Sequence, residues 1–138
     1  MEEEPGLSDQ YRKASPWPMF VALGFALSEV GIIIGIFPIA VGGLLLFGGS
    51  VAGILKESAY VDTLWGSLFA FGGALAAIGV GVVAWLVGID PGVLIDVIAA
   101  PGEFGLVVPR ALAVAIAGII LLAAGGTVQA LERNADLR

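Results

Sequence analysis

The feature that most limits how this chain can fold is an apolar stretch from Trp17 to Leu55, interrupted only by Ser28, Glu29 and Ser50. One helix of that length would far exceed a hydrocarbon core of about 30 Å, because a helix rises about 1.5 Å per residue. The whole chain is 59% hydrophobic and only 13% charged, whereas a soluble domain is about a quarter charged. We therefore expect lipid or other membrane helices to surround it.

The first stretch must turn back on itself, and Pro38 marks the place. Proline disfavours helix at the residue before it and suits the first turn of a new helix. We predict a tight hairpin here, with one helix over 18–36 and the next over 39–55.

The remaining sequence predicts two further spans. A third helix over 62–88 ends at the sequence Gly-Ile-Asp-Pro-Gly, and a fourth runs over 108–131. The loop 89–107 contains an apolar segment, 93–100, which is too short to span and is expected to form a short helix lying in the membrane interface. The expected domains are a polar N-terminal tail over 1–16 that is not a secretory signal, a transmembrane domain over 17–131 and a C-terminal tail over 132–138.

The predicted fold class is therefore all-α integral membrane, with four spans arranged as two hairpins. Four spans place both ends and the connection 56–62 on one side, and Arg110 on the other. We expect the protein to lie in the plasma membrane. Basic residues favour the cytoplasmic side, so both termini are expected in the cytoplasm. The basic residues on that side are Arg12, Lys13, Lys56, Arg133 and Arg138.

Composition excludes several kinds of chemistry. The chain has no cysteine and no histidine, which removes disulfides, thiolate or imidazole metal sites, and Cys- or His-based catalysis. A formal net charge of −6 argues against nucleic-acid binding. We expect no catalytic residue, no metal ligand and no cofactor held by this chain alone, although lipid is a possible ligand.

Glu29, beside Ser28, is the main intramembrane polar candidate. A carboxylate at this depth costs about 2.5–3.5 kcal/mol on insertion scales. It could bind a proton or cation, or it could make a structural contact with another helix or another subunit.

Small residues recur at a spacing of four, which predicts faces where helices approach closely. This spacing does not tell whether the neighbouring helix belongs to this chain or to another. The predicted packing residues are Gly31, Gly35, Gly49, Gly53, Gly73, Ala77 and Gly81.

The segments PGLSDQYRKASPWP, residues 5–18, and LSEVG, residues 27–31, resemble a family of small haloarchaeal membrane proteins. These proteins are encoded in gene clusters for haem-copper terminal oxidases, the cytochrome oxidases of the respiratory electron-transport chain. The resemblance extends over about the first 55 residues. It implies a non-catalytic accessory subunit that supports assembly or stability of the oxidase, with haem and copper in the partner subunits.

A second function remains open from the sequence. Small proton-coupled multidrug transporters also have four helices and one buried glutamate in the first. Under this transporter hypothesis, Glu29 would bind the ion or the substrate. The compact small multidrug transporters lack a long polar N-terminal tail and a loop like 89–107, which argues against this alternative.

Overall fold

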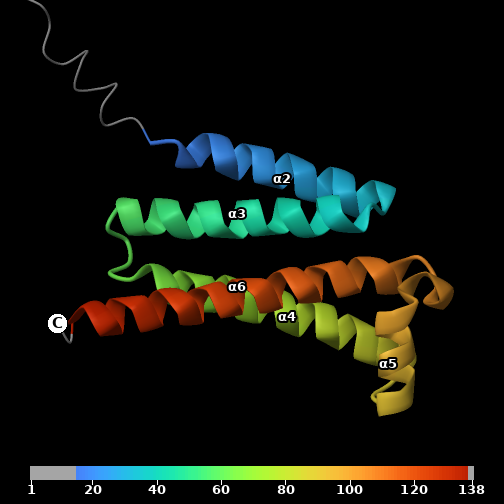
Figure 1. Cartoon of the computed structure of the whole chain (residues 1–138). Coiled ribbons are helices and arrows are strands. Elements are labelled where there is room, and N and C mark those ends of the chain that lie inside the picture. Colours follow the sequence, from blue (N-terminus) through green and yellow to red (C-terminus); the bar gives the residue numbers. More distant parts are fainter. Residues whose placement is uncertain (1–14, 137–138) are drawn as a thin grey trace, which may run out of the picture.

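The structure is a computed structural model, and it describes residues 15–136. The predicted tail over 1–16 therefore lies almost wholly outside the described residues. The described part is helical and has no strand, with four helices that are each long and apolar enough to cross a membrane. This confirms the predicted all-α class with four long apolar helices. The elements are α2 (Trp17–Ile34), α3 (Phe37–Glu57), α4 (Leu64–Val87), α5 (Pro91–Ala99), η1 (Pro101–Phe104) and α6 (Val107–Asp136) (Figure 1).

The turn between α2 and α3 forms where Pro38 predicts it. Gly35 adopts a left-handed conformation, with φ of 87°, which glycine accepts without steric cost. The amides of Gly35 and Ile36 both donate to the carbonyl of Gly31, at 2.8 and 2.9 Å, a common way to close the C-terminus of a helix. As a result α2 ends at Ile34, two residues before the predicted boundary.

The loop after α4 begins with an aspartate cap. The carboxylate of Asp90 accepts hydrogen bonds from the amides of Gly92 and Val93, at 2.8 and 3.3 Å, which satisfies free donors at the start of α5. The short helix expected in this loop is present, and Val97 on it is only 1% exposed. Val97 packs with Val83 of α4 and Val108 of α6, so α5 is fixed against the end of these two helices.

The fourth long helix continues past its predicted end at residue 131. α6 reaches Asp136, so most of the predicted C-terminal tail is helical. The sequence after Thr127 is VQALERNAD. It contains no glycine or proline and is rich in good helix formers, so nothing in it stops the helix.

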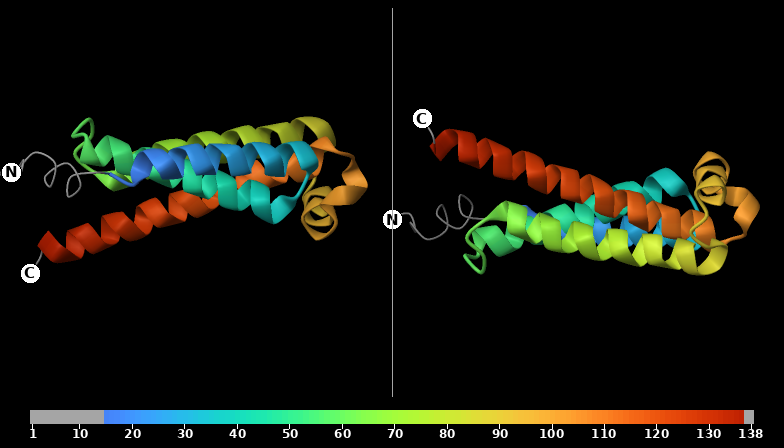
Figure 2. Two further views of the ribbon diagram at one scale, coloured as in Figure 1. Left: turned by 90° about the horizontal axis from the view of Figure 1, so that it is seen from above. Right: turned by 90° about the horizontal axis from the view of Figure 1, so that it is seen from below.

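The long helices pack mainly in two pairs. α2 lies along α3 and α4 lies along α6, and contacts between the pairs run mainly from α3 to α6 (Figure 1). Ala52, Leu68 and Leu121 form a buried cluster where the pairs meet. Towards its C-terminus α6 diverges from the other helices (Figure 2).

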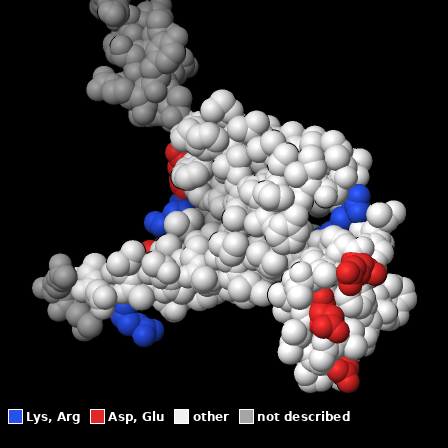
Figure 3. Space-filling view, turned by 45° about the vertical axis from the view of Figure 1, so that its right-hand side comes forward, with Lys and Arg blue, Asp and Glu red and all other residues white. Residues whose placement is uncertain are grey.

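Most of the apolar surface faces outward. Only 17% of the most apolar stretch of α2 and of α4 is buried, against 39% for α3 and α6. A soluble bundle would bury its apolar faces, whereas lipid can solvate them. On the face shown in Figure 3, charged side chains lie at the two ends of the molecule with an uncharged surface between them. This distribution indicates a membrane protein.

Candidate functional site

Ser28 and Glu29 are neighbours on α2 but face opposite ways. Ser28 is 4% exposed, and its hydroxyl donates to the carbonyl of Phe25 at 2.8 Å, so its polar group is satisfied within its own helix. Glu29 is exposed on the outward side of α2. The structure therefore separates the two polar candidates: Ser28 lies against α3, and Glu29 points away from it.

The carboxylate of Glu29 belongs to a distinct helical face. Ala22, Ala26, Glu29 and Ile33 follow one another at spacings of four, three and four residues, and all are exposed. Residues at these spacings share one side of a helix. We refer to these four residues as the Glu29 face. It combines two small residues, which permit close approach of another helix, with one hydrogen-bonding group.

The contact between α2 and α3 is made through glycines. A Cβ added at Gly24 would overlap the backbone of Phe47, and one added at Gly31 would overlap the backbone of Ala40. Gly43 is equally close to Ser28 from the α3 side. Gly31 was predicted from its four-residue spacing. Gly24 was missed, although its seven-residue distance from Gly31 also places the two on one face.

The contact between α4 and α6 uses a different stripe from the predicted one. A Cβ at Gly72 would lie 2.7 Å from the carbonyl oxygen of Gly118, and one at Gly79 would overlap the backbone of Ala115. A Cβ at Gly73 or at Gly81 would have no heavy atom within 4 Å. Ala77 is exposed. The predicted stripe of Gly73, Ala77 and Gly81 therefore lies outside the internal interface, on the outward side of α4.

Gly49 and Gly53 line a groove between the two helix pairs. A Cβ at Gly53 would lie 2.7 Å from the ring of Trp17, whereas one at Gly49 would have nothing within 4 Å. The groove has a volume of about 380 Å³. We call it the Lys56 groove, and its walls are Trp17, Gly49, Gly53, Lys56, Glu57, Leu64 and Leu68.

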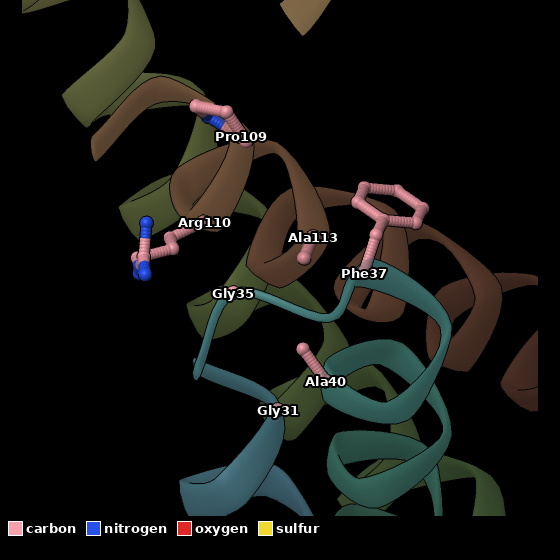
Figure 4. Close-up of a pocket in the computed structure, with 7 residues that line it drawn as sticks. All are labelled: Gly31, Gly35, Phe37, Ala40, Pro109, Arg110 and Ala113. Atoms are coloured by element: carbon pink, nitrogen blue, oxygen red, sulfur yellow. The ribbon is translucent and has the colours of Figure 1, made fainter. Parts of the chain in front are cut away.

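Arg110 binds the α2–α3 pair at the end that carries the α2–α3 turn, away from the Lys56 groove. Its Nε donates to the carbonyl of Ile32 at 2.6 Å and its Nη2 to that of Ile33 at 3.2 Å. A third bond runs from Nη1 to the carbonyl of Leu106 at 2.6 Å. A Cβ at Gly35 would lie 2.8 Å from Nη2, so the predicted packing residue Gly35 leaves room for the guanidinium (Figure 4).

A small cavity of about 20 Å³ lies beside this cap, which is room for about one water molecule. Gly31, Ala40 and Ala113 are among the residues that line it (Figure 4). The guanidinium points toward the turn and uses its donors on backbone carbonyls. The arrangement is a structural clamp between α2 and α6. Its partners lie 77 and 78 residues apart, so no local sequence pattern predicts it.

The fold and these sites define a small helical membrane protein with one carboxylate on an outward apolar face. Within residues 15–136, no three His, Cys, Asp or Glu side chains gather in a way that could hold a metal ion. A family model matches residues 1–131, and the chain belongs to that family, the family of unknown function DUF7541. A search of the curated proteins and a search of the solved structures found no match.

Proposed function

We propose that this chain is a non-catalytic accessory subunit of a larger membrane complex, and that it docks through the Glu29 face. The complex we expect is a respiratory haem-copper terminal oxidase. In this role the chain supports assembly or stability, while the partner subunits carry haem and copper.

The observation that carries the proposal is the exposure of Glu29. The residue lies about 9 Å along the helix axis from Gly35, at about 1.5 Å per residue, and its neighbours on the outward side are apolar. In lipid this carboxyl group would have no hydrogen-bonding partner among residues 15–136, at a cost of about 2.5–3.5 kcal/mol. A partner helix that supplies a donor at this depth removes most of that cost.

The small residues on the outward surface support the same function. Ala22 and Ala26 on the Glu29 face leave room for a second backbone. Gly73, Ala77 and Gly81 provide another such face on α4. Small residues that make no helix contact within the described part of the chain are suited to contacts with other helices, since packing rather than hydrophobicity drives helix association in a membrane.

The choice of an oxidase as partner rests on the resemblance of residues 5–18 and 27–31 to proteins encoded with terminal oxidases. It also agrees with the absence of histidine and cysteine. A chain without these residues contributes no imidazole or thiolate to haem or copper, so its contribution to an oxidase is helix packing.

For the membrane topology we propose two hairpins, α2–α3 and α4–α6, with both termini in the cytoplasm. The excess of basic residues in the tails and in the connection 56–62 supports this orientation. The exposed apolar side chains of α5, Ile95 and Ile98, would then lie in the outer interface of the plasma membrane.

The test is co-purification from native membranes in a mild detergent, with haem absorption as the readout. The tagged wild-type chain is expected to retain a haem-bearing partner. Glu29→Leu should reduce the haem retained per chain, and Glu29→Gln should retain more because an amide still forms hydrogen bonds. Asp96→Leu, which removes an exposed carboxylate from α5, is the matched control. A wild-type chain that purifies alone contradicts the proposal.

The transporter alternative receives less support from the position of Glu29. A coupling carboxylate must reach a water-accessible path, yet Glu29 lines neither the Lys56 groove nor the cavity at Arg110. Proton-coupled uptake into proteoliposomes that is abolished by Glu29→Gln would favour transport over a subunit role.

A further inference from the structure

The Lys56 groove opens between the two helix pairs at the end of the molecule where α3 ends and α4 begins. Leu64 and Leu68 of α4 form an apolar wall, and the ring of Trp17 covers Gly53 on the α3 side. Protein interiors are normally close-packed. A space of about 380 Å³ is within the range of about 300–1,000 Å³ that is usual for ligand pockets.

Among the described residues, the charged side chains that line the groove come from the end of α3. Lys56 and Glu57 lie in the last turn of α3 and are both exposed. The carboxylate of Glu57 accepts a hydrogen bond of 2.6 Å from the hydroxyl of Ser15, which draws it toward the start of α2. Among residues 15–136, Lys56 is the cationic residue that lines the groove.

An apolar interior with a cation at its mouth is complementary to an amphiphile that has an anionic head. The residues around the mouth of the groove are of types typical of the membrane–water interface. Trp17 begins an apolar helix, and tryptophan is enriched at this level. Lysine extends its charged end toward the interface while its methylene chain stays on apolar surface.

We propose that the Lys56 groove holds one acyl chain of a membrane phospholipid, and that the phosphate of this lipid pairs with the ammonium of Lys56. The lipid fills space that the side chains leave between α3 and α4. It thereby strengthens the contact between the α2–α3 pair and the α4–α6 pair. The proposal depends on a membrane location, and it is independent of any partner complex.

Gly49 allows the groove to be blocked without disturbing the helix. An added Cβ at Gly49 meets no heavy atom within 4 Å, and the same is true at Gly42, seven residues earlier on α3. Because seven residues are close to two helical turns, the two positions share a side of the helix. Only Gly49 lines the groove, so Gly42→Leu is a matched control for Gly49→Leu.

The experiment is native mass spectrometry of the delipidated full chain in detergent, titrated with phosphatidylglycerol or with diacylglycerol of the same acyl chains. Circular dichroism checks that each variant is folded. Wild type and Gly42→Leu are expected to bind one phosphatidylglycerol, and Gly49→Leu is expected to lose this binding. Lys56→Gln should reduce the preference for phosphatidylglycerol over diacylglycerol by about fivefold, which corresponds to the attraction of one lysine for an anionic headgroup.

Equal phosphatidylglycerol binding by Gly49→Leu and Gly42→Leu would overturn the location of the site. An unchanged lipid preference in Lys56→Gln would overturn the pairing with phosphate. Lys56 is exposed, so this variant decides the question of the headgroup even if Gly49→Leu fails to fold. Neither result depends on the haem measurement that tests the subunit role.

Discussion

The guanidinium of Arg110 donates a hydrogen bond of 2.6 Å from Nε to the backbone carbonyl of Ile32, 78 residues earlier in the chain. The last carbonyls of a helix have no partner within the helix, and a positive charge there also interacts favourably with the helix dipole. Arg110 therefore closes the C-terminus of α2 from α6. This bond ties together two helix pairs whose other contacts lie mainly between α3 and α6.

Loss of the arginine should loosen the clamp. We expect Arg110→Gln to lower the free energy of unfolding by about 1.5–3 kcal/mol, the usual contribution of a hydrogen bond to a charged group. Arg110→Lys should recover only part of it, because one ammonium group cannot reproduce the planar fork of donors. The measurement is denaturant unfolding in detergent micelles. Arg133→Gln, at an exposed position in the last turn of α6, should have little effect, and equal losses in both variants would contradict the clamp.

The turn that Arg110 holds also depends on Gly35. We expect Gly35→Ala to destabilise the protein by at least about 1–2 kcal/mol, because a side chain disfavours the left-handed conformation and its Cβ would crowd the guanidinium. Gly42→Ala, in the interior of α3 with open space around it, should instead stabilise by about 0.5–1 kcal/mol. Opposite signs for two identical substitutions are the expected result in a thermal unfolding comparison. Equal shifts for both would show that the strain at Gly35 is unimportant.

A third prediction separates the internal face of α4 from its outward face. Gly79→Leu should destabilise the isolated chain by about 3 kcal/mol or more, the upper part of the range for overpacking, because its Cβ overlaps the backbone of Ala115. Gly81→Leu should leave the isolated chain folded, since its Cβ has open space. Unfolding of the purified chain in micelles measures both.

Gly81→Leu then tests the outward face in the complex. If α4 docks on a partner through Gly73, Ala77 and Gly81, this variant should reduce co-purification while leaving the chain folded. Gly81→Ala, which is smaller, should retain more partner. Full retention by Gly81→Leu would restrict docking to the Glu29 face.

The positions of the long helices were predictable because each depends on local sequence. Apolar runs, Pro38 and the segment after Val87 fix where helices start and stop. The end of α6 was placed five residues too early, at 131, because falling hydropathy does not stop a helix that has good helix formers.

The faces of the helices were harder to predict. The chain has 21 glycines, so several helix faces carry small residues at a spacing of four. The sequence does not tell which of these faces packs against another helix of the chain. Thus Gly72 and Gly79 pack internally, whereas Gly73, one residue away, faces outward. The cap by Arg110 also depends on a distant partner, so its local sequence gives no indication of it.

The last prediction tests the environment of Glu29 before any partner is present. In a translocon insertion assay of the isolated α2 segment, Glu29→Leu should lower the apparent free energy of insertion by up to about 3 kcal/mol, the cost of a charged residue near the centre of a span. Ile33→Leu, on the same face, should change it little. If Glu29→Leu and Ile33→Leu insert equally well, Glu29 lies at the membrane surface and needs no partner. A large difference means that the wild-type helix keeps a carboxyl group in the membrane at an energetic cost. No contact within the described residues offsets this cost. A contact with a partner helix would offset it, and this is the physical basis for the proposed docking.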